Sequence, residues 1–378
     1  MPDLVGLFGI RLQLQIGQEV LAPAPYDVMD ALVSVQVTNN DSKRDGFQMV
    51  FRLGKTALPE YGLLSSGVLD IQNRVKISVT FGAMPQILID GIITDHQLKS
   101  DNEPGRTKLI VTGEDLGAKL TFDDRNRTHP QQSDSAIVEK ILSDAGFITE
   151  VTETRDTPSE SERISCQQCN NLNYIRKLAQ RNGFVFYIEP AAVPGKSIAY
   201  WGPENRQGEH QPALTMNMGA QTNVDTPISF HYNALGPAEP AVSILDPLTK
   251  TTMQIPNPSG FLPSLSAFPT APIRKVIPRD TANLSYAQGL LRAVTGVNES
   301  SGAIEGIGEV DAVRYGHALR SRRLVDVRGA GSSNDGTYYV KQVKHEITLH
   351  PRGEYKMHFT LTREGLGASR PSLGTQEA

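Results

Sequence analysis

The sequence predicts a mainly β protein that carries smaller α+β inserts. Residues 9–112 alternate between apolar and polar side chains in short runs, and residues 310–362 do so again. The composition includes 33 glycines and 24 prolines, which suits a β protein with many turns. At 378 residues the chain is too long for one ordinary core, so we expect two or three domains.

The amino-terminal block predicts a barrel or sandwich of antiparallel strands, because turn signals such as Asp45-Gly46 separate its alternating runs and no helical pattern lies between them. Polar positions such as Arg11 and Lys76 occupy the second face of these strands. That face either belongs to a half-buried sheet or lines a wide, water-filled channel, and periodicity does not separate the two. The predicted strands cover residues 9–16, 32–37, 47–53, 75–81, 87–94 and 107–112.

An α+β insert is predicted to follow over residues 125–205. Ser133 or Asp134 caps a helix that runs through Ala145, because a short polar side chain can accept hydrogen bonds from the first N–H groups of a helix. A short strand follows at 147–151. Inserts of this kind on β scaffolds often serve as docking surfaces.

Within this insert, residues 164–188 predict a helix that leads directly into a buried strand. Asn170 or Asn171 can cap the helix, and Gly183 stands where a helix ends in a left-handed residue. Residues 184–188 are aromatic and β-branched, which favours a strand. The apolar stripe of the helix consists of Leu172, Ile175, Leu178 and Ala179.

The middle of the chain changes character twice. Residues 213–232 return to a β pattern, and nine prolines between 234 and 279 then argue against a strand inside a sheet. The proline-rich segment is either an extended arm that wraps a neighbour or a mobile loop. A helix is predicted over 281–295, and a glycine-rich run at 296–308 returns the chain to the sheet.

The carboxy-terminal block predicts a second set of strands. Pro351-Arg352-Gly353 supplies the turn of a hairpin. Residues 364–378 are small and polar and predict a disordered tail. The predicted strands cover residues 310–313, 324–327, 338–349 and 355–362.

Two of these stretches share a pattern with a known family. A polar cap, an aromatic residue, spaced apolar residues and a Gly before an aromatic strand fall on Tyr174, Ile175, Leu178, Ala179, Gly183, Phe184 and Phe186. Residues 336–347 together with 355–359 supply a Tyr-Val strand, a His two residues past a Val, and a later Tyr and Phe. Both stretches resemble the phage late-control protein D family, the tail hubs that include the amino-terminal part of VgrG spike proteins. The family usually has Glu-Ser-Asp where this chain has Cys169, Asn170 and Asn171.

The resemblance implies two related β-barrels per chain and three chains in a ring with near-sixfold inner symmetry. In the family this baseplate hub joins a hexameric tail tube to a trimeric spike in a contractile injection machine. The implied role is that of a structural symmetry adaptor and not of an enzyme. The implied domains are a first barrel at 1–124, the α+β insert at 125–205, a second barrel at 206–235 and 309–365, a Pro-rich and helical insert at 236–308, and a disordered tail at 366–378.

The implied partners are two further copies of the chain, the tail tube, a spike and baseplate wedge components. The sequence lacks the glycine-punctuated repeats of a VgrG needle, so we expect a separate spike protein that meets residues 336–378. The runner-up function is a cell-wall or carbohydrate-active hydrolase on a β scaffold. A third is a baseplate or adhesion module other than a hub.

No residue is predicted to be catalytic, to bind a cofactor or to hold a metal ion. Cys166-Gln-Gln-Cys169 has the spacing of a redox dithiol or half a zinc site, but zinc normally takes four ligands and the chain has only two Cys. Structural thiols are the favoured interpretation. Residues 302–308 are glycine-rich but lack the Lys-Ser/Thr of a phosphate-binding loop.

The remaining candidates are histidines and a short basic run. His345, His350 and His358 could approach one another across the predicted hairpin, although a His on a strand is seldom a ligand. Arg320-Ser-Arg-Arg323 predicts an exposed face or ion pairs to a neighbouring subunit. The other histidines considered are dispersed, at 129, 210, 231 and 317.

The charge balance and the number of cysteines limit which partners and which cellular compartment we expect. With 37 basic and 41 acidic residues the net charge is −4, so nothing indicates nucleic-acid binding. No apolar run approaches the roughly 18 residues of a membrane span. Two cysteines exclude a disulfide framework, so we expect synthesis in a reducing cytoplasm. The family resemblance implies assembly into a phage tail or a similar particle.

Overall fold

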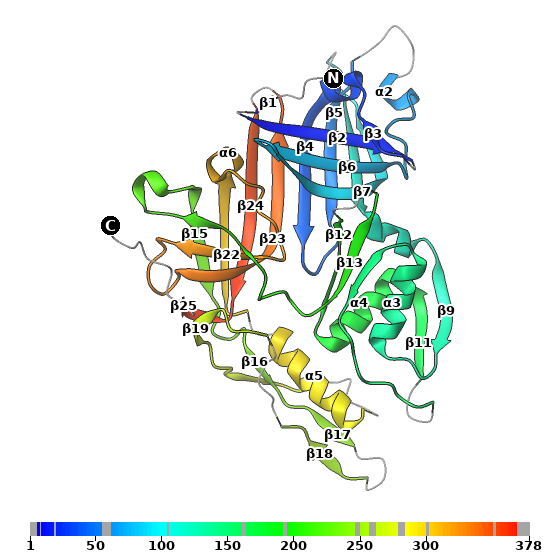
Figure 1. Cartoon of the computed structure of the whole chain (residues 1–378), viewed down its shortest axis with the longest axis vertical. Coiled ribbons are helices and arrows are strands. Elements are labelled where there is room, and N and C mark those ends of the chain that lie inside the picture. Colours follow the sequence, from blue (N-terminus) through cyan, green and yellow to red (C-terminus); the bar gives the residue numbers. More distant parts are fainter. Residues whose placement is uncertain are drawn as a thin grey trace.

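One large sheet of fourteen strands dominates the molecule, and a compact α+β unit and a long arm project from its lower end (Figure 1). The mainly β prediction with small inserts is therefore confirmed. No helix in the described part of the chain is long and apolar enough to cross a membrane. This computed structural model describes residues 6–7, 9–18, 20–54, 62–103, 106–160, 164–191, 195–245, 250–256, 262–278, 284–299, 302–350 and 353–368.

The first strand set closes around its own apolar side chains. Its longest strand, β7, pairs with β6 through its first half and with β8 through its second half, so it belongs to two layers. In Figure 1 the strands β2 and β6 therefore cross steeply in front of β4 and β5. The elements are β1 (Gly6–Leu7), β2 (Ile10–Gly17), β3 (Ala22–Pro23), α1 (Tyr26–Ala31), β4 (Leu32–Asn40), β5 (Gly46–Arg52), α2 (Gly62–Ser65), β6 (Arg74–Phe81), β7 (Met84–Lys99), β8 (Lys108–Asp115) and η1 (Leu116–Thr121).

The second strand set continues the same sheet. Strand β23 pairs with β24 along its length, and residues 342–348 of β23 also pair antiparallel with β4 of the first set. This pairing fuses the two sets into one wall, and one apolar core runs through both. The elements are β14 (His210–Thr215), η2 (Gly219–Gln221), β15 (Val224–Tyr232), β21 (Ile304–Asp311), α6 (Ala312–Tyr315), β22 (Leu324–Arg328), β23 (Gly336–Thr348) and β24 (Glu354–Arg363).

The α+β insert has a separate core, in which Trp201 is fully buried. The predicted caps are confirmed, since the Asn170 side chain accepts from the Asn173 N–H at 3.0 Å and that of Ser133 from the Ala136 N–H at 3.3 Å. Gly183 ends its helix with φ 67°. The elements are β9 (Asp124–His129), α3 (Asp134–Asp144), β10 (Ile148–Val151), β11 (Ser165–Asn170), α4 (Asn171–Asn182), β12 (Val185–Pro190) and β13 (Ser197–Gly202).

The arm follows the second strand set and carries the proline-rich segment. Its strands form only two-stranded pairs, β16 with β20, β17 with β18, and β19 with the carboxy-terminal β25 (Gly365–Ala368), as expected where proline removes backbone donors. Its helix α5 extends to Glu299, four residues beyond the predicted end, and the predicted start at 281–283 lies outside the described residues. The elements are β16 (Ala238–Pro240), β17 (Ser243–Leu245), β18 (Thr252–Gln254), β19 (Ser266–Pro269), β20 (Arg274–Val276) and α5 (Tyr286–Glu299).

Two predictions near the carboxy terminus are wrong. The strand expected at 310–313 begins already at Ile304, and α6 follows at once. Only residues 304–308 of the glycine-rich run lie in this strand, and there a Cβ at Gly308 would lie 2.6 Å from the ring of Phe359, so glycine leaves room for the ring. The expected tail is ordered through β25 (Gly365–Ala368), and residues 369–378 lie outside the described residues.

Candidate functional site

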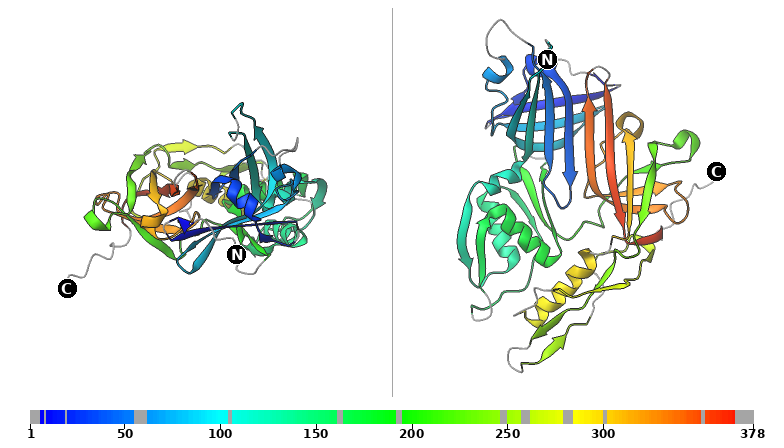
Figure 2. Two further views of the ribbon diagram at one scale, coloured as in Figure 1. Left: turned by 90° about the horizontal axis from the view of Figure 1, so that it is seen from above. Right: turned by 180° about the vertical axis from the view of Figure 1, so that it is seen from behind.

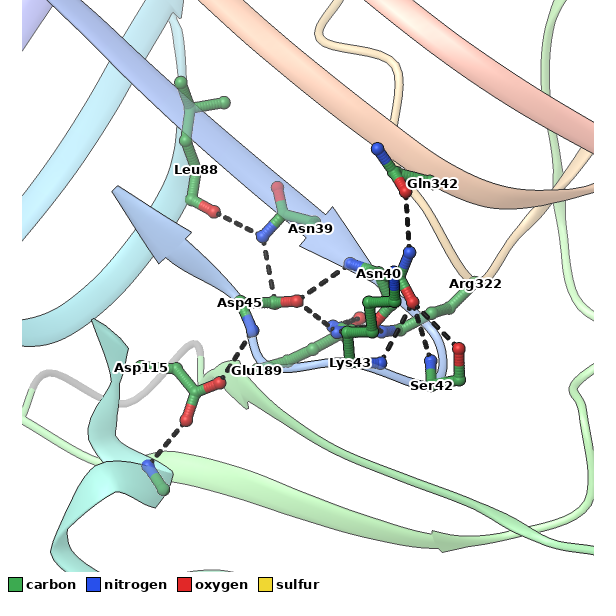
Figure 3. Close-up of polar contacts among 11 residues, drawn as sticks. Asn39, Asn40, Ser42, Lys43, Asp45, Leu88, Asp115, Glu189, Arg322 and Gln342 are labelled. Carbon is green, nitrogen blue, oxygen red and sulfur yellow. Dashed lines mark hydrogen bonds and ion pairs between the residues drawn. The ribbon is translucent and has the colours of Figure 1, made fainter. Parts of the chain in front are cut away.

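A buried polar cluster lies where the two strand sets and the α+β insert meet (Figure 3). Its centre is Arg322, which precedes β22 and whose side chain is only 3% exposed. We call this cluster the Arg322 junction and define it as Arg322 with Asn40, Asp45, Tyr187 and Glu189. Each of the three regions contributes at least one of these residues.

The backbone holds Arg322 in an unusual position. Its φ of 64° is left-handed, which a residue with a side chain adopts at a cost of about 1–2 kcal/mol. Its N–H donates to the Val340 carbonyl oxygen at 2.7 Å, which ties the segment to β23. A strained conformation at a buried arginine indicates that the surrounding contacts fix the side chain in one direction.

The first strand set supplies the acceptors for the guanidinium group. The Arg322 Nη2 atom donates to the Asn40 carbonyl oxygen at 2.5 Å and to Asp45 Oδ1 at 2.6 Å. The Nε atom donates to the same Asn40 carbonyl oxygen at 3.2 Å. Because Asp45 is also only 3% exposed, this ion pair is shielded from water on both sides.

The turn between β4 and β5 is built to present these acceptors. The Asn40 Oδ1 atom accepts from the N–H groups of Ser42 and Lys43 at 2.9 and 3.0 Å, and this local turn is typical of asparagine. The Asp45 carboxylate accepts from the Asn40 N–H and from the Asn39 Nδ2 atom, each at 2.9 Å. The carboxylate is therefore oriented by the turn itself as well as by Arg322.

The α+β insert reaches the junction through β12. The Arg322 guanidinium carbon lies 4.2 Å from the centre of the Tyr187 ring, a distance at which a cation is attracted to the face of an aromatic ring. The Arg322 Nη1 atom lies 3.6 Å from Glu189 Oε1. One arginine thus contacts both strand sets and the insert, three regions far apart in the sequence.

The junction perturbs several pKa values. Burial raises the pKa of the Asp115 carboxyl to about 7, and repulsion from the Asp45 carboxylate adds to the rise. Hydrogen bonds from the Gly117 and Asp45 N–H groups, at 2.7 and 3.1 Å, oppose it. Burial alone would lower the pKa of Arg322, but attraction to Asp45 and Glu189 outweighs burial and raises it. Arg322 therefore keeps its charge.

A second buried pair lies on the apolar side of β23 and β24. His345 Nδ1 and the Tyr355 hydroxyl are 2.8 Å apart, and both residues are at most 2% exposed. Burial lowers the pKa of His345 to about 3, and the positive charge of Arg320 contributes. His345 is therefore neutral at physiological pH and serves as a hydrogen-bonding core residue.

The structure separates His345, His350 and His358, the three histidines of the predicted hairpin. His358 lies opposite Lys344 on the polar face of the hairpin, whereas His345 points to the core and His350 is exposed beyond the strand. Cys166 and Cys169 are free thiols on β11, three positions apart and so on opposite faces of the strand. Among the described residues, no group of three His, Cys, Asp or Glu side chains could hold a metal ion.

The basic run at 320–323 is the sequence feature whose interpretation the structure changes most. The prediction of an exposed face is wrong for Arg322, which pairs within its own chain, and holds only for Arg323. The interpretation failed because Arg322 and Asp45 are 277 residues apart, and no local pattern marks such a pair. The left-handed φ of Arg322 leaves no trace in the sequence either.

Comparisons with known proteins show which solved structures have a similar fold. A family model described as the Alg8 N-terminal domain matches residues 27–205, which is less than half of the chain. No curated protein matches the sequence. Among solved structures, the tail protein from Neisseria meningitidis MC58 is 12% identical with a TM-score of 0.64, over 94% of this chain and 98% of that chain.

Two further structures agree with that comparison. The 43 kDa tail protein of prophage MuSo2 from Shewanella oneidensis is 12% identical with a TM-score of 0.61, over 94% of this chain and 98% of that chain. The E. coli c3393 protein, described as a component of the type VI secretion system with structural similarity to phage T4 tail proteins, is 15% identical with a TM-score of 0.56, over 90% of this chain and 76% of that chain. The chain therefore has the fold of phage tail proteins.

Proposed function

We propose that this chain is a structural tail-hub subunit of a phage-like contractile injection machine. Three copies form a ring with near-sixfold inner symmetry that joins a hexameric tail tube to a trimeric spike. The observation that carries the proposal is the single wall formed by two strand sets through the pairing of β4 with β23. Two strand sets in each of three chains give six sets around one axis.

The outward face of this wall suits the lining of a water-filled channel. Rows of polar side chains cross β4, β23 and β24 in register, and the row of Thr38, Lys344 and His358 is one example. The opposite face of these strands is apolar and packs into the common core. The polar positions are Ser34, Gln36, Thr38, Gln342, Lys344, Glu346, Thr348, Glu354, Lys356, His358, Thr360 and Thr362.

Charged side chains on this face pair with one another, either along one strand or between neighbouring strands. Lys356 Nζ lies 2.9 Å from Glu309 Oε1, and Lys344 Nζ lies 3.3 Å from Glu346 Oε2. His358 lies between Glu309 and Glu346, at 3.3 and 3.4 Å. A hydrated face whose charges pair with one another offers little for a passing molecule to bind, which is what a conduit needs.

The fold comparisons support a part in a tail or a type VI-like device, since two of the similar structures are tail proteins and a third is a type VI component. We extend the proposal to the partners, namely the tail tube, a separate spike and baseplate wedge components. In this proposal the chain acts without catalysis and is assembled into the baseplate of a particle. The predicted domain boundaries stay part of the proposal.

Imaging of the purified chain, alone and mixed with a candidate spike protein, tests the proposal. Native mass spectrometry measures the copy number, and negative-stain images show whether an axial opening is present. A three-copy ring that caps the spike is the expected result. Monomers that persist in the presence of the spike would overturn the ring, and hydrolysis of peptidoglycan or glycans by those monomers would favour the alternative of a hydrolase.

A further inference from the structure

A groove of about 470 Å³ lies between the α+β insert and helix α5, in the region where Figure 2 shows α5 running beside the insert. This volume falls within the roughly 300–1,000 Å³ of ligand-binding pockets. One wall is α5, and the other is the extended segment 152–156 that continues β10. No residue of the Arg322 junction lies in either wall.

The helical wall of this α5 groove is apolar and in part open to solvent. Ala287 and Leu291 are four residues apart on α5, so they share one side of the helix, and Leu284 lines the groove just before the helix begins. The other side of α5 is already covered, because it packs on Ile244 and Ile255 of the arm. Leu284 also packs in part on this core, so Ala287 and Leu291 are the apolar groove residues that the core of the arm does not include.

The strand wall offers free backbone groups. In the sheet of β10, β13 and β12, strand β10 lies at an edge, and the Thr152 N–H still donates to the Trp201 carbonyl oxygen of β13 at 2.8 Å. No backbone hydrogen bond is formed by Glu153 or Arg155 to any residue that the structure describes. Because N–H and C=O groups alternate in direction along an extended chain, those of Glu153 and Arg155 point away from β13.

The groove is formed in advance. Asp134 Oδ2 accepts from Asn182 Nδ2 at 2.7 Å and from Arg181 Nε at 2.9 Å, which fixes the floor. The Gln288 Nε2 atom donates to Asp156 Oδ2 at 2.7 Å and links the two walls. A site that needs little rearrangement loses little entropy when it is occupied.

We propose that the α5 groove binds an extended peptide segment of a partner protein by strand addition. The peptide backbone pairs with Glu153 and Arg155, and alternate apolar side chains lie against Leu284, Ala287 and Leu291. An exposed sheet edge is where an extended peptide can add a strand, with pockets for its alternate side chains giving specificity. Glu153 and Arg155 are exposed, opposite in charge and on one side of the strand, so the peptide carries a basic and an acidic residue at the matching positions.

The probe is a synthetic library of fluorescent octapeptides in which apolar residues alternate with Thr, Lys and Glu. Two matched variants of the full chain are compared by fluorescence polarisation, Ala287→Glu inside the groove and Tyr286→Glu on the adjacent exposed position outside it. We expect Ala287→Glu to weaken binding of the selected peptides at least tenfold and Tyr286→Glu to leave it unchanged. Methylation of alternate backbone nitrogens in the peptide is expected to abolish binding.

Hydrogen exchange gives an independent measurement. The Glu153 and Arg155 amides are expected to become protected when the selected peptide is present. The proposal is overturned if no library member binds the wild-type chain at millimolar concentration. It is equally overturned if peptides bind but Ala287→Glu and backbone methylation leave their affinity unchanged, since that result places them elsewhere.

Discussion

Distant segments of the chain meet both in the Arg322 junction and in the α5 groove. The junction is buried and its polar groups are paired, whereas part of the groove stays open. In the junction, Arg322 and Asp45 are buried and their hydrogen-bonding groups find partners within the chain. In the groove, an apolar helix face and the backbone of Glu153 and Arg155 stay open. The chain thus completes the contacts that fix its own shape and leaves open those suited to another molecule.

The largest effect is expected from breaking the junction. Arg322→Met keeps an unbranched, flexible side chain but leaves the buried Asp45 carboxylate without its cation, which costs about 3–5 kcal/mol of unfolding free energy. Arg323→Met is the matched control, because that side chain is exposed and should change stability by less than about 0.5 kcal/mol. Urea unfolding measures both. Equal losses of unfolding free energy in the two variants would show that the buried Arg322 pair does not stabilise the fold more than an exposed arginine does.

A smaller effect is expected from Asp115→Asn. The amide can accept only one of the two hydrogen bonds that the carboxylate accepts, so we expect a loss of about 1–3 kcal/mol near neutral pH. The variant also loses a pH dependence. Since the pKa of Asp115 is raised from 3.8 to about 7, its contribution to wild-type stability is present below pH 4 and is lost as pH rises through 7.

Unfolding free energies measured from pH 4 to 8 check this sign. The difference between wild type and Asp115→Asn should be largest at the acid end of that range and shrink toward pH 8. A difference that grows with pH would mean that the carboxyl is ionised in the folded state throughout.

His345→Gln should have a still smaller effect at neutral pH, about 1 kcal/mol, because the amide can keep a hydrogen bond to Tyr355. Its pH dependence has the opposite sign. The folded-state pKa of His345 is lowered to about 3, so its contribution is present above pH 6.5 and is lost as pH falls through 3. Acid unfolding monitored by circular dichroism should therefore begin at a lower pH in the variant, and an unchanged midpoint would contradict the assignment.

The smallest effect on stability is expected in the groove. Ala287→Glu and Tyr286→Glu alter exposed positions on α5, so each should change the unfolding free energy by less than about 0.5 kcal/mol. Thermal unfolding of the two variants beside wild type measures this. A marked loss for Ala287→Glu alone would show that the groove is closed in solution, and the contrast with the junction would fail.

Local chemistry explains what the sequence could predict. The cap at Asn170 and the left-handed Gly183 were foreseen because both act within one turn of the same helix. The pair β9 and β11 was missed because these strands carry polar residues on both faces, with Gln167 fully buried, and periodicity detects only apolar alternation. Arg322 was missed because its partners come from segments that the sequence keeps far apart.

The pairing that joins the two strand sets could not be predicted from the sequence either. The strands on each side, β4 and β23, were both predicted, but nothing in either sequence specifies that they pair with each other. Register between strands 300 residues apart depends on how the two sets pack, which only the folded chain determines. The same holds for the groove, whose walls come from the insert and the arm.

In our interpretation the two strand sets form one rigid wall, and the Arg322 junction locks this wall to the insert. Hydrogen exchange of the backbone amides in β4 and β23 tests this interpretation. We predict that these amides are as slow to exchange as those between β5 and β8, and that Arg322→Met speeds exchange on both sides of the β4–β23 pairing together. Fast exchange at β4 and β23 in the wild type, beside slow exchange within each set, would show two independent units and contradict the account.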